Sequence, residues 1–136
     1  MRDSVSIIIP TYNRASLLQE TLKSILGQSF PFLQVIVVDD GSTDSTSETL
    51  QMLKDSRLLV LKNNSNLGES ASINTGWNHR IQKLVAIVLS DDPQETIWLE
   101  KMINFRNENP GFLIYYPDLK IIDKHGLVKT LLPLRD

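Results

Sequence analysis

The sequence predicts an α/β fold, with a mostly parallel sheet flanked by helices and a C-terminal antiparallel hairpin. Short β-branched runs such as residues 35–38 are continuously apolar rather than alternating, which is typical of strands buried on both faces. These runs alternate with segments of helical periodicity, the order found in doubly wound parallel sheets with right-handed crossovers.

The strands are predicted from apolar runs and the residues that end them. The first strand, Val5–Ile9, is expected to end at Pro10, because proline has no N–H to donate to the ladder. The other predicted strands are Val35–Val38, Leu58–Leu61, Leu84–Leu89 and Phe112–Tyr116. Ile121–Ile122 and Leu127–Val128 flank the turn signal 123–126 and indicate the hairpin.

The helices are predicted from apolar spacing and end signals. Residues 15–26 place their leucines and isoleucine on one face, with Asn13 as a plausible N-cap and Gly27 as the stop. Ser45 and Glu48 have capping-box spacing ahead of a second helix. A third helix is expected over residues 69–79, and a fourth from about residue 97 to the Asn109-Pro110-Gly111 stop.

Composition limits the function classes. With 136 residues, of which 41% are hydrophobic, the chain can form a single domain, residues 1–136. A formal net charge of -2 and the lack of a basic stripe argue against nucleic-acid binding. The N-terminus enters the first strand without room for a signal peptide, and no apolar run approaches the roughly 20 residues of a membrane span, so we expect a cytoplasmic protein.

Two acidic pairs, Asp39-Asp40 and Asp91-Asp92, follow predicted strands. Ligands of open α/β sheets bind outside the carboxyl ends of the strands, so these carboxylates mark the candidate site. They could hold a divalent cation, accept hydrogen bonds from a base or ribose, or abstract a proton, and spacing alone does not choose among these. The structural alternatives are a helix-capping pair for Asp39-Asp40 and a solvated turn for Asp91-Asp92.

Three motifs carry a family resemblance. Residues 7–14 (IIIPTYNR), 37–44 (VVDDGSTD) and 66–71 (NLGESA), with Asn74 and Gly76, resemble the nucleotide-binding half of family 2 glycosyltransferases. The resemblance runs from residue 5 to about residue 130. It implies a GT-A (Rossmann-like) fold that binds a nucleoside diphosphate sugar, most often a UDP sugar.

The resemblance also implies roles for the first two motifs. Pro10 and Tyr12 are expected to line the base pocket, with Tyr12 stacking on the base. Asp40 is expected to bind the base edge, and Asp39 to support the turn that follows.

In the later motifs, Gly68 and Ser70 are expected to lie against the nucleotide. Asp91 is expected to reach the ribose, and Asp92 a Mn²⁺ or Mg²⁺ ion on the diphosphate. The usual pattern has a further Asp before the Ser of this motif, and that position is Leu89 here, which argues against chelation by two carboxylates.

The family reaction is direct displacement at the sugar C1 with inversion, with a carboxylate base that activates the acceptor hydroxyl. In the family this base lies beyond a segment such as 112–128, so the catalytic residue is unassigned and the chain is expected to be the donor-binding part of a domain truncated at its C-terminus. The expected acceptor is a glycan or a lipid-linked glycan. Peripheral association with the cytoplasmic face of a membrane, through segments outside this chain, and self-association at an exposed apolar end near Asp118 are further expectations.

The rival function is a non-catalytic nucleotide or nucleotide-sugar binding module. A response-regulator receiver is disfavoured because the first strand ends in Pro10-Thr11 rather than in an acidic pair. A dinucleotide oxidoreductase is disfavoured because no G-x-G-x-x-G follows that strand.

Overall fold

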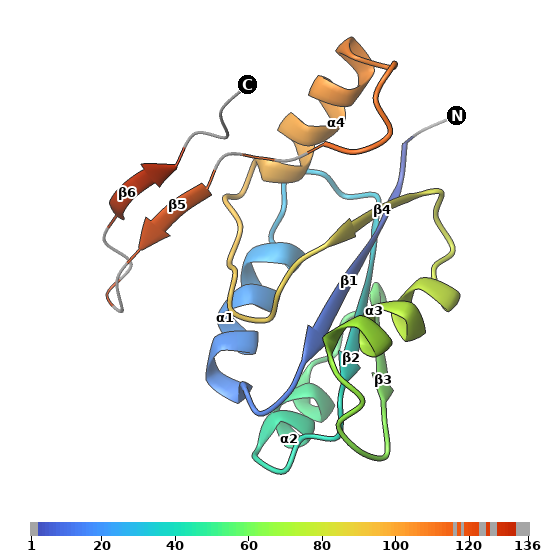
Figure 1. Ribbon diagram of the computed structural model, residues 1–136, viewed down its shortest axis with the longest axis vertical. Helices are drawn as coiled ribbons and strands as arrows, with labels where there is room; N and C mark the ends of the chain where they lie inside the picture. Colours follow the sequence, from blue (N-terminus) through green and yellow to red (C-terminus); the bar gives the residue numbers. More distant parts are fainter. Residues whose placement is uncertain (1–2, 116, 118, 123–124, 126–127, 133–136) are drawn as a thin grey trace. The chain divides into compact units, whose positions relative to one another are not determined.

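The computed structural model describes residues 3–115, 117, 119–122, 125 and 128–132. Contacts divide the chain into two units, residues 1–99 and residues 100–136. The first unit contains a four-stranded parallel sheet with the spatial order β3-β2-β1-β4 (Figure 1), built from β1 (Val5–Thr11), β2 (Leu33–Asp39), β3 (Leu58–Lys62) and β4 (Leu84–Ile87).

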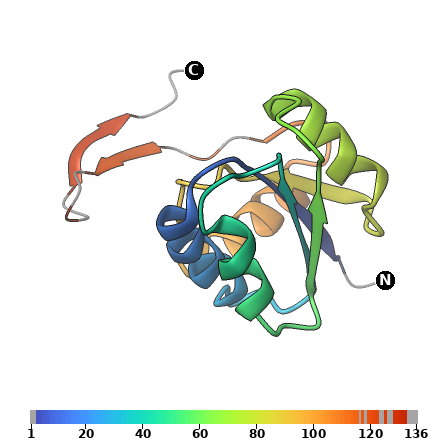
Figure 2. The same ribbon diagram turned by 90° about the horizontal axis from the view of Figure 1, so that it is seen from below.

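Helices cover both faces of this sheet. The helices α1 (Ala15–Leu26) and α2 (Thr46–Met52) lie on one face, and α3 (Glu69–Asn78) lies on the other (Figure 2). Strand side chains alternate between the faces, so Ile8 and Val38 point to α3 while Ile7 and Val37 point to the opposite layer. Such burial on both faces explains why the strands are continuously apolar.

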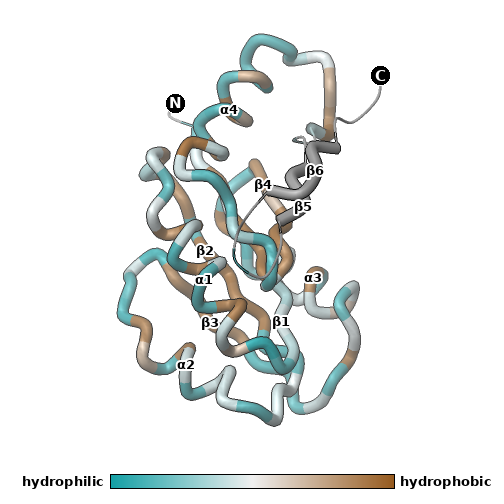
Figure 3. Tube along the Cα trace, turned by 90° about the vertical axis from the view of Figure 1, so that its left-hand side faces the viewer, coloured by the Kyte–Doolittle hydropathy of each residue, from teal (hydrophilic) through white to brown (hydrophobic). Residues whose placement is uncertain are grey.

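The core is concentrated in the two central strands. Every residue of β1 is buried, as is β2 apart from half-buried Gln34, and these strands contribute much of the apolar, brown trace in Figure 3. The apolar face of α1 buries Leu18, Leu22 and Ile25, as its spacing predicts. The strands β3 and β4 are less buried because they form the edges.

The prediction that Pro10 ends the first strand is wrong. The strand continues to Thr11, and Pro10 pairs with Val38 of β2. Ile8 accepts a hydrogen bond from the Val88 N–H on the β4 side, and Pro10 faces the same side two residues later. Because the pairing with β4 stops at Ile8, no ladder bond on that side requires the missing N–H.

Two predicted caps are also wrong. Arg14 is the N-cap of α1, while Asn13 has a positive φ of 51° and bonds the next βα loop instead. Ser45 does precede α2, but its side chain makes no capping hydrogen bond, so the Ser45–Glu48 capping box does not form. The predicted stop at Gly27 is confirmed.

The C-terminal half departs most from the sequence prediction. The strand β4 ends at Ile87 rather than at Leu89, and the helix α4 spans Trp98–Glu108. Residues 112–115 form no strand, because Tyr115 folds back and donates its hydroxyl to the carbonyl oxygens of Asn109 (2.7 Å) and Phe112 (2.9 Å). Tyr116 lies outside the described residues.

The second unit contains the strands β5 (Leu119–Ile122) and β6 (Val128–Leu132), which pair antiparallel. The predicted hairpin turn, Asp123-Lys124-His125-Gly126, lies outside the described residues except for His125. Asp118 and Leu127 also lie outside them.

Gly76 provides a test of how closely α3 packs on the sheet. A Cβ atom at this position would lie 2.5 Å from Ile8 Cγ2, so we expect Gly76→Ala to destabilise the fold by about 1–3 kcal/mol despite the higher helix propensity of alanine. Urea denaturation measures the change. Gly111→Ala is the control, because open space surrounds that position. Equal stability of the two variants would contradict the close packing.

Candidate functional site

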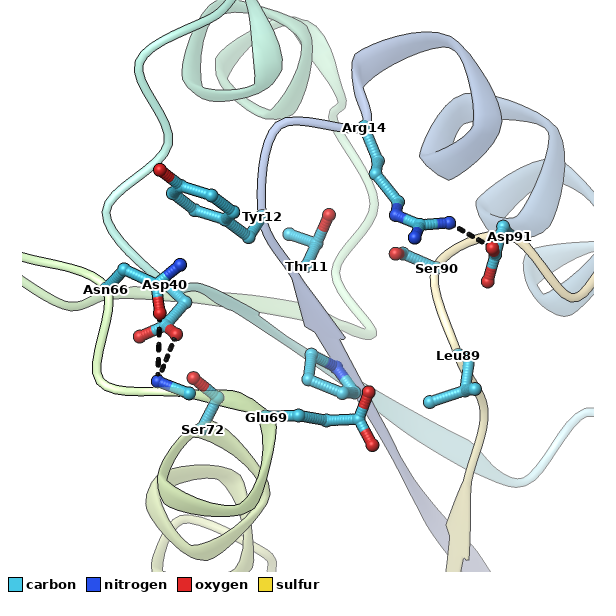
Figure 4. A pocket seen from close by; sticks show the side chains of 12 residues that line it. Thr11, Tyr12, Arg14, Asp40, Asn66, Glu69, Ser72, Leu89, Ser90 and Asp91 are labelled. Atoms are coloured by element: carbon cyan, nitrogen blue, oxygen red, sulfur yellow. Dashed lines mark hydrogen bonds and ion pairs between the residues drawn. The ribbon is translucent and has the colours of Figure 1, made fainter.

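A pocket of about 270 Å³ opens at the carboxyl ends of the central strands (Figure 4). Four segments of the first unit form its wall: the end of β1 with the following loop, the end of β2, the loop into α3, and the segment after β4. The lining residues are Pro10, Thr11, Tyr12, Arg14, Asp40, Asn66, Gly68, Glu69, Ser72, Leu89, Ser90 and Asp91.

The strand register brings these segments together. Thr11 pairs with Asp39, and Asp39 pairs with Lys62, so β1, β2 and β3 end at the same level. Ile8 pairs with Ile87, which places Ser90 near the level of Thr11 three residues later along both chains. Parallel pairing therefore brings the loops after all four strands to one edge.

The Asp40 carboxylate is the most extensively hydrogen-bonded acceptor in the pocket. Only 3% of the residue is exposed. Its Oδ1 accepts from Asn63 Nδ2 (2.7 Å) and from the Leu67 N–H (3.0 Å), and its Oδ2 accepts from the Gly68 N–H (2.8 Å). Burial alone would raise its pKa, but these bonds, together with one from Ser72, hold the pKa below the ordinary value of 3.8.

Asp39 is turned toward the other face of the sheet. Only 1% exposed, it accepts hydrogen bonds from the Ser42 N–H (2.9 Å) and from the Ser47 hydroxyl (2.7 Å). Lys62 Nζ lies 3.8 Å from the same carboxylate. The two neighbouring acids thus have separate tasks, because alternation directs Asp39 to the α2 layer and Asp40 to the α3 layer.

Gly41 allows the loop after β3 to approach the end of β2. Its φ is +75°, and a Cβ atom there would lie 2.7 Å from the carbonyl carbon of Ser65 and 3.0 Å from Asn66 N. Only glycine adopts this backbone and permits such an approach without strain. The approach is what brings the Leu67 and Gly68 N–H groups to Asp40.

Asn13 connects the loops after β1 and β2. Its Oδ1 accepts from the Thr43 N–H (2.8 Å) and the Asp44 N–H (3.2 Å), and its own N–H donates to Ser42 Oγ (3.0 Å). Asp44 in turn accepts from the Ala15 N–H (3.4 Å) at the start of α1. These bonds hold the loop that carries Tyr12 against the loop that follows Asp40.

The segment after β4 is held by polar side chains at the C-terminal end of α1 and just after it. Thr21 donates to the Ser90 carbonyl (3.1 Å), and Ser24 Oγ accepts from the Gln94 N–H (2.9 Å). Gln28 donates to the Glu95 carbonyl (2.8 Å) and accepts from the Leu99 N–H (3.0 Å). Thr21 and Ser24 lie three residues apart on α1, and Gln28 follows its C-cap, so the last turns of the helix and the residue after its end position the segment that carries Asp91.

Charged groups are unevenly distributed around the pocket. Asp91 forms an ion pair with Arg14, and both side chains are partly exposed. Asp92 does not line the pocket and is exposed as a residue. Nevertheless, partial burial of its carboxyl group raises its pKa, a hydrogen bond from Gln94 partly offsets this, and the nearby Asp91 charge raises the pKa further.

The comparisons with known proteins decide the family. A family model described as Glycosyl transferase family 2 matches residues 6–126. The chain belongs to glycosyltransferase family 2. It is 32% identical over 111 residues to UDP-Glc:alpha-D-GlcNAc-diphosphoundecaprenol beta-1,3-glucosyltransferase WfaP of Escherichia coli, an alignment that covers 82% of this chain and 44% of WfaP.

Two solved structures of glycosyltransferases are similar in fold. S. aureus TarS 1-349 in complex with UDP-GlcNAc gives a TM-score of 0.72 at 31% identity, covering 77% of this chain and 31% of TarS 1-349. The mannosyltransferase PcManGT from Pyrobaculum calidifontis in complex with GDP-Man and Mn2+ gives 0.62 at 33% identity, covering 67% and 28% of the two chains. The predicted α/β fold of GT-A type is confirmed. The chain spans less than half the length of the curated relatives that it matches, WfaP included.

For a family 2 chain, the structure brings most of the expected residues to one place. Pro10, Tyr12, Asp40, Gly68 and Asp91 all line the pocket. Three others do not: Asp39 stabilises the turn on the opposite face, Ser70 is exposed in the first turn of α3, and Asp92 lies in the exposed loop after Asp91.

Several pocket residues were missed at the sequence level. Thr11, Arg14, Asn66, Glu69, Ser72 and Leu89 line the pocket, and Asn63 supports Asp40 from outside it. Thr11 and Arg14 belong to the motif at 7–14, so their position next to Tyr12 was an available signal. Nothing in the sequence shows that Asn63 and Ser72 approach Asp40, because those contacts depend on how α3 packs.

The acidic side chains fit a hard divalent cation in one way only. Among the described residues, no group of three or more His, Cys, Asp or Glu side chains could hold a metal. Carboxylate oxygens nevertheless suit Mg²⁺ and Mn²⁺, which commonly bind one or two carboxylates together with substrate phosphates. With Leu89 in place of an acid, a single carboxylate from the Asp91-Asp92 pair plus a diphosphate is the donor set that the chain supports.

The hydrogen bonds to Asp40 predict a pH dependence of stability. Because the pKa in the folded state is lowered, the carboxylate stabilises the fold above pH 3.8, and this stabilisation is lost as the pH falls through the folded-state pKa. We expect Asp40→Asn to make the loss of stability on acidification shallower. We also expect it to abolish the acid titration of the Gly68 amide in NMR spectra.

Asp55→Asn is the control for this experiment. The pKa of Asp55 is lowered to about 2 by Arg57, so its removal also makes the acid transition shallower, but it leaves the Gly68 amide untouched. If the Gly68 amide signal of the Asp40→Asn protein shows the same acid titration as in the native chain, the hydrogen bond from Gly68 to Asp40 is not what holds this loop.

The buried hydroxyl of Thr11 allows a second prediction about the pocket when no ligand is bound. Its hydroxyl is buried and has no hydrogen-bond partner within the part of the chain that the structure describes. We expect Thr11→Val to raise the free energy of unfolding by about 1 kcal/mol, because it removes a buried unsatisfied group. Thr21→Val is the matched control and should lower it, because Thr21 donates to the Ser90 carbonyl. Equal losses in urea denaturation would contradict the unsatisfied state of Thr11.

Proposed function

We propose that this chain is the donor-binding part of a glycosyltransferase that transfers a sugar from a UDP sugar to an acceptor hydroxyl with inversion. The observation that carries the proposal is the pocket itself: an aromatic ring, a buried carboxylate and a second acidic loop surround one cavity in a family 2 chain. TarS in complex with UDP-GlcNAc and the UDP-Glc-dependent relative favour uracil as the base.

Three residues would hold the nucleoside. Tyr12 is 40% exposed at the pocket and offers its ring to the base, a stacking contact worth about 1–3 kcal/mol. Asp40 lines the pocket and would accept a hydrogen bond from the imide N–H of uracil in place of the one from Ser72. Asp91 would accept hydrogen bonds from the ribose hydroxyls.

Other residues would shape the site around the nucleotide. Pro10 closes the base pocket from β1, and Gly68 allows close approach of the backbone at the start of α3. Ser70 would contact the nucleotide from the first turn of that helix. Asp39 acts indirectly, because it stabilises the turn that follows Asp40.

A divalent cation, Mn²⁺ or Mg²⁺, would be held by Asp92 together with the diphosphate. The mannosyltransferase structure contains GDP-Man and Mn2+, which supports a metal-assisted donor site. When bound, the cation would neutralise the charge that develops on the departing diphosphate. The base that takes the proton of the acceptor hydroxyl is not assigned to any residue of this chain.

The acceptor and the cellular location are part of the proposal. The family and the lipid-linked acceptor named for WfaP favour a glycan or a lipid-linked glycan, used in the cytoplasm at the inner side of the membrane. None of the described helices has the length and hydropathy of a membrane span. In the second unit, residues 112–114 are exposed apolar side chains that could support self-association.

The test is calorimetric titration of UDP with and without Mn²⁺. We expect Mn²⁺ to tighten UDP binding to the native chain, and we expect Asp92→Ala to abolish that enhancement because the metal loses its protein carboxylate. Glu48→Ala, which removes an exposed acid in the first turn of α2, is the control and should keep the enhancement. Sugar transfer is assayed separately on the whole protein that contains this chain.

Each result separates the candidate functions. An unchanged Mn²⁺ enhancement in Asp92→Ala would refute the metal assignment. Lack of any UDP binding by the native chain would refute the donor site. Binding without sugar transfer by the whole protein would favour a non-catalytic nucleotide-sugar binding module.

A further inference from the structure

The charge of the pocket poses a problem for a diphosphate ligand. Three of the lining side chains, Asp40, Glu69 and Asp91, are carboxylates, while Arg14 is the one basic side chain among the lining residues. A diphosphate adds further negative charge to this surface. A divalent cation offsets part of that charge, and any further compensation from the lining has to come from Arg14.

Arg14 is in a position to provide it. The residue is the N-cap of α1, directly after the loop that carries Tyr12, and its guanidinium lines the pocket. Nη1 donates to Asp91 Oδ2, and this is the one side-chain partner of the guanidinium among the described residues. A guanidinium has five N–H donors, so most of them remain available, and 45% of the side chain is exposed.

A polar group in the same wall of the pocket lacks a hydrogen-bond partner as well. The Thr11 hydroxyl is buried in the pocket wall without a hydrogen bond within the described part of the chain. Figure 4 shows the hydroxyl of Thr11 and the side chain of Ser90 on the same side of the pocket as the guanidinium.

We propose that Arg14 binds the diphosphate of the nucleotide donor and that Asp91 orients its guanidinium for this contact. The inference rests on the proposed function and adds a phosphate ligand to it. The planar guanidinium suits phosphate oxygens, to which it donates two parallel hydrogen bonds. Asp91 can accept from Arg14 on one oxygen and from ribose on the other, so the two contacts are compatible.

The test compares two ligands that differ only in the diphosphate. UDP and uridine are titrated into the native chain and into Arg14→Gln, with Mn²⁺ present, and dissociation constants are measured by NMR. We expect Arg14→Gln to weaken UDP binding about ten-fold or more and to leave uridine binding unchanged. Arg14→Lys keeps the charge but not the paired donors, and we expect a smaller loss for UDP.

Arg80→Gln is the matched control. It removes the same charge at the far end of α3, where the Arg80 guanidinium stacks on Trp77 and does not line the pocket. We expect it to leave both dissociation constants unchanged. Thermal denaturation of each variant confirms that the fold is retained.

The outcomes distinguish this inference from the proposed function. If Arg14→Gln weakens UDP and uridine equally, Arg14 acts only by positioning Asp91, and the phosphate contact is refuted. If UDP binding is unchanged, Arg14 is no ligand at all. If the native chain binds neither UDP nor uridine, the proposed function fails and this inference fails with it.

Discussion

One buried carboxylate connects most of the site. Asp40 ends β2, and its two oxygens accept hydrogen bonds from a side chain after β3 and from the backbone that begins α3. Without these acceptors, the Leu67 N–H would lose this partner and the Gly68 N–H would keep only Asn66 Oδ1, so the start of α3 would be held less firmly against the sheet. Asp40 therefore shapes one wall of the pocket before any ligand is bound. Gly41 is the steric condition for this arrangement, because a larger residue would push the loop away.

The opposite wall depends on a helix rather than on its own strand. The strand β4 has only four residues and lies at the edge of the sheet, so it cannot by itself fix the loop that follows it. Thr21 and Ser24 of α1, together with Gln28 just after the helix, hold that loop through hydrogen bonds to its backbone. The same helix begins at Arg14, which reaches Asp91. The helix α1 thus links the tyrosine loop after β1 to the acidic loop after β4.

The sequence predicted the sheet better than the loops, for a physical reason. Continuous apolar runs report burial on both faces, and this property is local, so β1, β2 and the helices beside them were located within a few residues. The exceptions depend on neighbours far along the chain. Pro10 is tolerated in β1 only because β4 stops pairing at Ile8, and Asn13 bonds residues 43 and 44 instead of capping α1. The donors to Asp40 follow from the packing of α3, which no local pattern encodes.

The distribution of charge explains how this site can differ from the usual family pattern and remain consistent. Leu89 replaces an acid, so one carboxylate fewer repels the incoming diphosphate and one fewer is available to a cation. The acids that remain still outnumber Arg14 in the lining, so a diphosphate would need positive charge from both a cation and the guanidinium. Asp91 already neutralises part of the guanidinium charge through the ion pair. The attraction of Arg14 for a phosphate therefore depends on how strongly that ion pair is maintained when the nucleotide binds. If ribose hydroxyls donate to Asp91, its carboxylate would neutralise the guanidinium less, so under the proposal above recognition of the nucleoside would favour the contact of Arg14 with the phosphates.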